Sequence, residues 1–122
     1  NIVALVDVDQ KRLDEAAKKN EKNHLDAGGN APKAPKLFQD YRKMFDEMAG
    51  EIDGVIVSTP DHTHYVAAML AIQHGKHVCV QKPLCNYISE VRNLHKAAKT
   101  AGIVTQMGNQ GRTMDGQRIA KE

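Results

Sequence analysis

Short apolar runs alternate along the chain with helical segments of ten or more residues, and this alternation constrains the fold more than any other feature. The runs lie at 2–8, 37–38, 55–59, 77–81 and 103–107. The longer runs are rich in β-branched residues, which is typical of strands buried on both faces of a parallel sheet. Because parallel strands need crossover helices between them, the pattern predicts a doubly wound α/β fold of the Rossmann type.

The segments between these runs carry the expected signals of helix ends. Asp9 and Asp40 are placed to cap helices at their start, and Gly75 and Gly102 to end them. The residues from 24 to 36 are rich in Gly and Pro and predict a loop. Apolar spacing gives each helix a buried face, and these faces are Leu13, Ala16 and Ala17; Met44, Phe45 and Met48; Val66, Met69, Leu70 and Gln73; and Val91, Leu94 and Ala98.

Composition limits the classes of function. At 122 residues the chain has the size of one domain able to bury its own core. No run approaches the roughly 20 apolar residues of a membrane span. The net charge is only +2, the lysines are scattered and there is no Trp, so we expect no nucleic-acid partner and no membrane partner. Cys79 and Cys85 match no zinc motif and are interpreted as buried thiols.

Polar residues follow the predicted strands at their carboxyl ends, where ligands bind in an open parallel sheet. Each alone carries little information, but the ends of parallel strands meet at one edge, so together they predict a ligand cleft. The residues at these ends are Asp7, Asp9, Ser58, Thr59, Pro60, Gln81, Lys82, Pro83, Gln106, Gly108 and Asn109.

Asp7 is the first acidic residue after a predicted buried strand. A carboxylate in this place can accept hydrogen bonds from both hydroxyls of an adenosine ribose and would repel the 2′-phosphate of NADP. The alternative is a helix cap, but Asp9 is better placed for that role. Asp7 is therefore a candidate for binding NAD rather than NADP.

The glycine-rich turn that binds a dinucleotide phosphate is absent. It should lie about twenty residues before the ribose-binding acid, and only six residues precede Asp7. The glycines at 28 and 29 follow a helical segment rather than a strand. We expect the chain to be a fragment that lacks the first strand, turn and helix of such a domain. The lost strand would be central, so Leu5 should not pair with Ile56.

His62 and His64 open a helix directly after Pro60. Two histidines at positions i and i+2 do not face each other in a helical turn, so we expect no metal site. One ring should instead point into the cleft, and His64 is the candidate.

Three stretches, VIVSTPDHTH, GKHVCVQKPL and TQMGNQG, resemble the Gfo/Idh/MocA family of NAD(P)-dependent oxidoreductases, which includes glucose–fructose oxidoreductase and inositol dehydrogenase. The resemblance covers nearly all 122 residues as part of the family's nucleotide-binding domain. Its hallmark is a Glu-Lys-Pro tripeptide after the fifth strand, and this chain departs from it with Gln81 before Lys82 and Pro83.

The resemblance implies roles for matching positions. Lys82 would be the catalytic residue, contacting the nicotinamide and a substrate hydroxyl. Ser58, Thr59 and Pro60 would lie along the dinucleotide, His64 would close over it, Asn109 would flank the nicotinamide, and Asp7 would bind the ribose. Gln81 keeps an acceptor that could orient Lys82, but lacks the carboxylate charge that would act on the lysine.

The expected function is hydride transfer between NAD and a hydroxyl-bearing carbon of a sugar or cyclitol, with residues 1–122 as part of the cofactor domain. The family's second domain, which carries an Asp-x-x-x-His pair, is missing from this chain. Two alternatives remain: NAD-assisted glycoside cleavage, and a non-catalytic NAD sensor. We expect the full protein to be a homo-oligomer in the cytoplasm, with the periplasm as the alternative.

Overall fold

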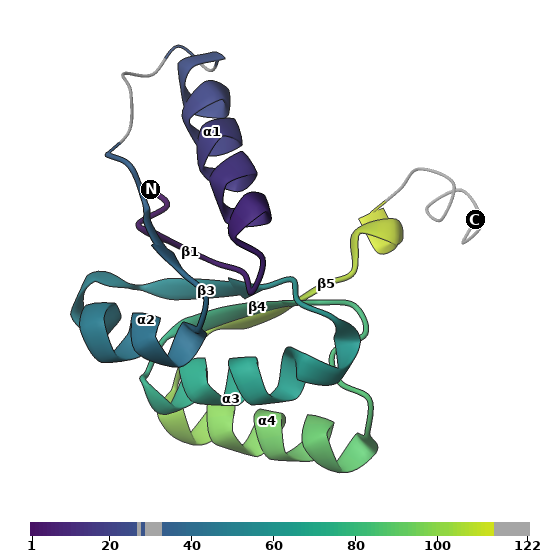
Figure 1. Cartoon of the computed structure of the whole chain (residues 1–122). Helices are drawn as coiled ribbons and strands as arrows, with labels where there is room; N and C mark the ends of the chain where they lie inside the picture. Colours follow the sequence, from purple (N-terminus) through teal and green to yellow (C-terminus); the bar gives the residue numbers. More distant parts are fainter. Residues whose placement is uncertain (27, 29–32, 114–122) are drawn as a thin grey trace. The chain divides into compact units, whose positions relative to one another are not determined.

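The computed structural model describes residues 1–26, 28 and 33–113, in two compact units divided after Ile52. Each unit is built from parallel strands and helices, as predicted (Figure 1). Neither contains a described helix with the length and apolar character needed to cross a membrane.

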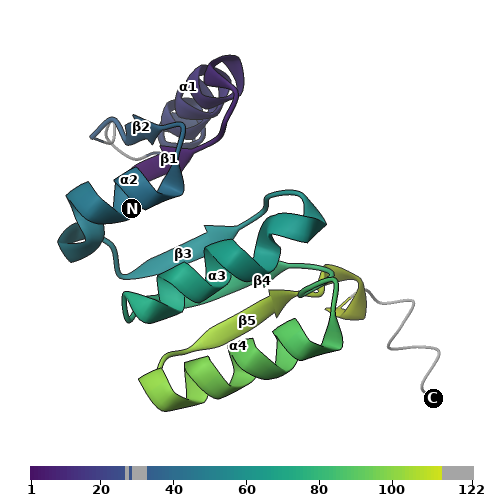
Figure 2. The ribbon, with the colours of Figure 1, turned by 60° about the horizontal axis from the view of Figure 1, so that its bottom comes forward.

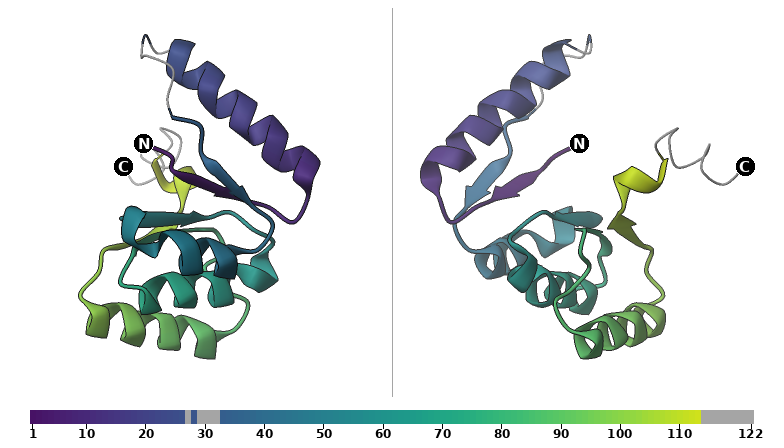
Figure 3. Two further views of the ribbon diagram at one scale, coloured as in Figure 1. Left: turned by 60° about the vertical axis from the view of Figure 1, so that its left-hand side comes forward. Right: turned by 90° about the vertical axis from the view of Figure 1, so that its right-hand side faces the viewer.

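The first unit contains a sheet of two parallel strands, β1 (Ala4–Val6) and β2 (Lys36–Phe38), in which Leu5 pairs with Leu37 (Figure 3). Its helices are α1 (Gln10–Asp26) and α2 (Tyr41–Met48), followed by a 3-10 helix at Ala49–Glu51. Asp40 caps α2 as predicted, because its Oδ1 accepts the Arg42 N–H at 2.9 Å. The predicted buried face of α2 is confirmed, with each of its three residues at most 5% exposed.

Two expectations for this unit are wrong. The first strand spans 4–6 rather than 2–8 and is half-buried, not buried on both faces. In α1 only Leu13 is buried, whereas Ala16 is exposed. Length explains the second difference: α1 extends for about 25 Å, but a three-residue strand offers only about 10 Å of sheet to pack against.

The second unit contains a sheet of three parallel strands in the order β3 (Gly54–Val57), β4 (His77–Gln81) and β5 (Thr105–Gly108). The helices α3 (His64–Gln73) and α4 (Ile88–Ala101) lie side by side on one face of this sheet (Figure 2). Ile56 pairs with Cys79 rather than with Leu5, so the described strand pairs are those expected for the order 3-2-1-4-5-6 without its first strand.

Short 3-10 helices adjoin two of these elements, η2 at Asp61–Thr63 before α3 and η3 at Gln110–Thr113 after β5. The two glycine stops are confirmed by their positive φ angles, 70° at Gly75 and 64° at Gly102.

The buried face of α3 differs from the predicted one. The buried residues are His64, Ala67, Ala68, Ala71 and Ile72, whereas Val66 is 48% exposed and Gln73 is also exposed. This helix is apolar around most of its circumference, so hydrophobic spacing could not identify the buried side. The small alanines allow α3 to approach the sheet and α4 closely.

The apolar strands of the second unit predict a sheet that is buried on both faces. In the structure the helices cover only one face of this sheet. Val57, Val78 and Val80 are buried beneath the helices, but Ile56 is 78% exposed because alternate side chains of a strand point to opposite faces. The covered face, together with Leu94 of α4, forms the core of this unit.

Candidate functional site

Three strand ends of the second unit meet at one edge of its sheet. The register places Val57 beside Val80 and Val80 beside Met107, so the residues that follow these strands leave the sheet together. Ser58, Lys82 and Asn109, all exposed, are therefore at the same edge, as expected. Such an edge is where open parallel sheets bind ligands.

Lys82 combines a held backbone with an exposed side chain. Its backbone N–H donates to Oε1 of Gln81 at 2.9 Å, and its peptide bond to Pro83 is cis. Among the described residues its ammonium has no hydrogen bond or ion pair. The Lys82 ammonium at this strand end therefore remains available to a ligand.

Gln81 lies over Gly108 of the neighbouring strand. A Cβ at Gly108 would be 2.5 Å from the Gln81 Oε1 and 2.9 Å from its Cδ, so any larger residue would force the end of the Gln81 side chain to move from this position. The amide oxygen of Gln81 makes the hydrogen bond that a carboxylate oxygen could make in its place. Sequence reasoning missed the role of Gly108, although a glycine at a strand end is a known sign of close approach.

His64 is not placed as expected. Its ring is 1% exposed and does not point into a cleft. The Nδ1 lies 2.7 Å from the Pro83 carbonyl oxygen and the Nε2 lies 2.8 Å from the Thr59 carbonyl oxygen. The expectation that this ring closes over a dinucleotide is corrected: the ring joins the ends of two strands inside the protein.

The two ring nitrogens of His64 both face carbonyl oxygens. A neutral imidazole has one N–H and one lone pair, whereas both neighbours of His64 are acceptors. Both contacts are hydrogen bonds at the same time only when both ring nitrogens carry a proton. We call the pair of contacts, from Thr59 O through His64 to Pro83 O, the His64 bridge.

The segment after β3 is fixed by a second set of hydrogen bonds. The Thr63 hydroxyl oxygen is 2.8 Å from the Thr59 hydroxyl and 2.7 Å from the Pro60 carbonyl oxygen. The Thr63 N–H also donates to the Pro60 carbonyl oxygen at 2.9 Å. The exposed turn that begins at Ser58 is thus held by the start of the next helix.

Asp7 belongs to the first unit, where it follows β1. Its Oδ1 accepts the Asp9 N–H at 2.9 Å, and Asp9 in turn accepts the N–H of Lys11 at 2.9 Å and of Arg12 at 3.4 Å. Asp9 is therefore the cap of α1, as expected. Within the described part of the chain the second carboxylate oxygen of Asp7 has no hydrogen bond, which leaves it available to a hydroxyl.

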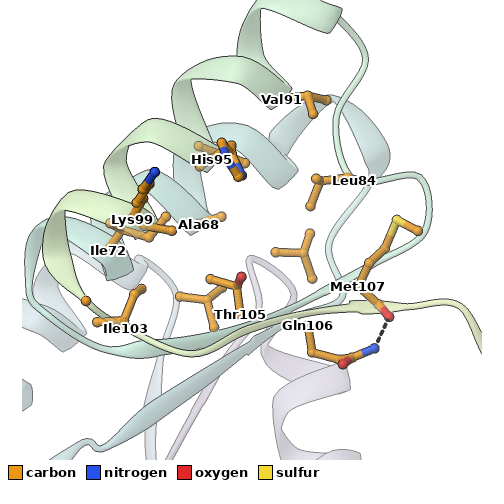
Figure 4. A pocket seen from close by; sticks show the side chains of 15 residues that line it. Ala68, Ile72, Leu84, Val91, His95, Lys99, Ile103, Thr105, Gln106 and Met107 are labelled. Carbon is orange, nitrogen blue, oxygen red and sulfur yellow. Dashed lines mark hydrogen bonds between the residues drawn. The ribbon is translucent and has the colours of Figure 1, made fainter.

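A groove of about 610 Å³ lies between α4 and β5 on the covered face of the sheet (Figure 4). Val91, Leu94, Ile103 and other apolar side chains form most of its lining. Neither Lys82 nor the segment after β3 contributes to it, so this groove is separate from the strand-end edge.

Cysteine and metal chemistry find no support in the described residues. Cys79 and Cys85 are unpaired and half-buried. Burial, together with the nearby Glu90 carboxylate, raises the pKa of the Cys85 thiol and so disfavours a reactive thiolate. Across residues 1–26, 28 and 33–113, no group of three His, Cys, Asp or Glu side chains is arranged to hold a metal ion.

Comparison with known proteins places this geometry in context. Residues 1–109 match the model of the oxidoreductase family with an NAD-binding Rossmann fold, GFO_IDH_MocA. A scyllo-inositol 2-dehydrogenase (NADP(+)) of Bacillus subtilis is 42% identical over 53 residues, which are 43% of this chain and 15% of that protein. A scyllo-inositol 2-dehydrogenase (NAD(+)) of the same organism is 35% identical over 57 residues, 47% of this chain and 17% of that protein.

A solved structure extends the likeness to nearly the whole chain. The apo scyllo-inositol dehydrogenase of Lactobacillus casei aligns with a TM-score of 0.73 and 26% identity, over 99% of this chain and 32% of that one. The chain therefore spans about a third or less of the length of these proteins.

Proposed function

Because this chain belongs to the oxidoreductase family with an NAD-binding Rossmann fold, we propose that it forms part of the cofactor domain of an NAD-dependent dehydrogenase acting on a sugar or cyclitol. One observation carries the proposal: the Lys82 ammonium stands unpaired, among the described residues, at the strand-end edge where the fold binds ligands. The inositol dehydrogenases among the relatives support the substrate class.

Each unit, taken by itself, carries residues that fit part of a dinucleotide. Asp7 has a free carboxylate oxygen for a ribose hydroxyl, and Ser58, Thr59 and Pro60 form an exposed turn at the ligand edge of the second unit. Asn109 leaves β5 at the same edge. The bound nicotinamide would supply the hydride acceptor; the contribution of this chain is to hold it and to orient the substrate.

Lys82 would act on the oxygen of the reacting C–O bond. During oxidation the substrate carbon loses a hydride and its hydroxyl loses a proton, so negative charge develops on that oxygen. A fixed ammonium stabilises this charge most in the transition state, which raises the rate rather than only the affinity. In line with the family resemblance, we propose that the proton is taken by an Asp or His of a second domain.

Asp7 supports NAD as the preferred cofactor. Its carboxylate would repel the 2′-phosphate of NADP and accept the 2′-hydroxyl of NAD. The relatives include both an NADP(+) and an NAD(+) enzyme, so the preference rests on this residue. Gln81 still accepts the backbone N–H of Lys82, which supports a positioned lysine and a catalytic role rather than a non-catalytic sensor.

The test uses the full-length protein that contains this chain. It is incubated with NAD or NADP and a panel of sugars and cyclitols that includes scyllo-inositol, while the absorbance of the reduced nicotinamide is followed. We expect reduction of NAD with at least one cyclitol or sugar. Tight NADH binding by calorimetry without turnover of any substrate would instead indicate a sensor, and absence of binding would contradict the proposal.

A further inference from the structure

His64 is the one buried polar or charged residue among the described residues, and hydride transfer as proposed does not use it. It begins α3, and its ring reaches backbone atoms that are 5 and 19 residues away in the chain. One of these, the Pro83 carbonyl, follows Lys82 directly. The other, the Thr59 carbonyl, lies in the turn assigned to the dinucleotide.

We propose that His64 is a positioning residue, which sets the Lys82 ammonium against the bound dinucleotide by joining the two strand ends that carry them. The inference rests on the proposed function and deepens it. It concerns the same site, but assigns a role to a residue that touches neither cofactor nor substrate.

The contacts around Lys82 show why the position of Pro83 matters. Gln81 holds the backbone N–H of Lys82, and His64 holds the carbonyl of the next residue. The lysine backbone is therefore fixed on both sides by side chains. If the Pro83 contact is lost, the segment after Lys82 is held only by its chain neighbours, and its Cα can shift relative to the sheet.

The Thr59 contact has a different consequence. The turn at Thr59 and Pro60 is also held by Thr63, but those bonds tie it to the start of α3 rather than to β4. The His64 bridge is the described contact that links this turn to the Lys82 segment. Loss of the contact between His64 and Thr59 should weaken cofactor binding. Loss of the contact between His64 and Pro83 should slow the chemical step.

Two substitutions of His64 remove its contacts with Thr59 and Pro83 one at a time. In His64→Asn the amide nitrogen lies near the position of Nδ1 and can still donate to Pro83, but nothing reaches Thr59. In His64→Gln the amide nitrogen lies near the position of Nε2 and can donate to Thr59, but the Pro83 contact is lost. Each variant keeps one of the two contacts of the His64 ring and removes the other. A merely structural role would lower stability without separating kcat from the KM for NAD.

The expected results for the full-length enzyme differ in kind. His64→Asn should raise the KM for NAD by about tenfold, the equivalent of one lost hydrogen bond, and change kcat by less than about threefold. His64→Gln should lower kcat by about 10- to 100-fold, as a misplaced catalytic group does, with the KM for NAD changed by less than about threefold.

His62 supplies the matched control, because it lies two residues earlier, is exposed and has no assigned role. His62→Asn and His62→Gln should leave kcat and KM within about twofold of the unsubstituted enzyme, as ordinary surface changes do. If both His64 variants change kcat and KM in the same proportion, or neither differs from its His62 control, the inference is overturned.

Two further measurements separate this inference from the proposed function. If no substrate is found, calorimetry with NADH should still show weaker binding for His64→Asn than for His64→Gln. If the unsubstituted protein binds no NADH, the proposed function fails, but backbone NMR still tests the bridge. Shifts should then concentrate near Thr59 in His64→Asn and near Pro83 in His64→Gln, and identical shift patterns would contradict the bridge.

Discussion

The strand ends that carry Asp7 and Lys82 are held in different ways. Asp7 accepts the N–H of Asp9, and Asp9 accepts the N–H of Lys11, so each contact spans two residues. The Lys82 end depends on His64, 19 residues from Pro83, and on Gln81, which needs the room left by Gly108 on the next strand. The Asp7 carboxylate is thus oriented by its neighbours in sequence, although its backbone N–H also donates to the Phe38 carbonyl oxygen at 3.1 Å. The segment around Lys82 depends in addition on side chains, those of His64 and Gln81, whose placement is set by the tertiary structure.

The difference between the Asp7 and Lys82 strand ends has a functional consequence. An error of a few tenths of an ångström costs a binding contact little, whereas a group that acts in the transition state must be placed closely. We therefore expect substitutions at the Asp7 end to alter which cofactor binds, and substitutions at the Lys82 end to alter the rate.

The largest expected effect is that of Lys82→Met in the full-length enzyme. Loss of the ammonium should lower kcat by about 100-fold or more, because it interacts with charge that develops in the transition state. NADH affinity by calorimetry should change by less than about threefold. A variant that loses NADH affinity in proportion to its rate would assign Lys82 to binding and remove the contrast with Asp7.

At the Asp7 end, Asp7→Asn keeps an oxygen that can accept the Asp9 N–H but removes the charge. The ratio of kcat/KM for NAD to that for NADP should fall by about tenfold, because the 2′-phosphate is no longer repelled. Thermal stability should not change, since the local turn is kept. An unchanged cofactor ratio would mean that Asp7 does not face the ribose.

The packing of Gln81 on Gly108 can be measured with a double-mutant cycle. Gly108→Ala should displace the Gln81 side chain and lower the free energy of unfolding by about 1 kcal/mol, the value of one hydrogen bond. In a Gln81→Ala background the same change should cost less than about 0.5 kcal/mol, because the two residues are in contact. Equal costs in both backgrounds would show that the Lys82 end does not depend on this pair.

The smallest effect concerns another local contact, the Asp40 cap of α2. The N–H of Arg42, with the charges of Arg42 and Lys43, lowers the pKa of Asp40 below its ordinary value of 3.8. The cap therefore contributes stability above that value, and the contribution is lost as the pH falls through the lowered pKa of the folded protein.

Urea unfolding of the unsubstituted protein and of Asp40→Ala checks this contact. The stability difference between the two should be present at neutral pH and shrink in acid, where the carboxylate is protonated. A difference that stays constant with pH would show that the charge of Asp40 is not part of the cap.

The same contrast explains what could be predicted from the sequence. The strand 77–81 was predicted with its observed bounds because His77 follows a glycine stop and Pro83 lies just beyond its end. The caps Asp9 and Asp40 were predicted because capping depends on residues two or three positions away. These are all local signals.

Features that depend on distant residues were missed or misplaced. The buried face of α3 could not be identified from the sequence of an apolar helix, and nothing near His64 in sequence indicates that its ring contacts the Pro83 carbonyl. The role of Gly108 requires knowledge of which strand lies beside Gln81. Candidate site residues could thus be proposed from the sequence, whereas the contacts that hold the backbone of Lys82 in place could not.

The most direct test of the central claim is a crystal structure of the full-length protein with NADH and a sugar or cyclitol bound. We expect the Nζ of Lys82 within hydrogen-bonding distance of the substrate oxygen beside the nicotinamide, with His64 still joining Thr59 and Pro83. A Lys82 side chain turned to bulk solvent, or a dinucleotide bound at the opposite edge of the sheet, would contradict the account.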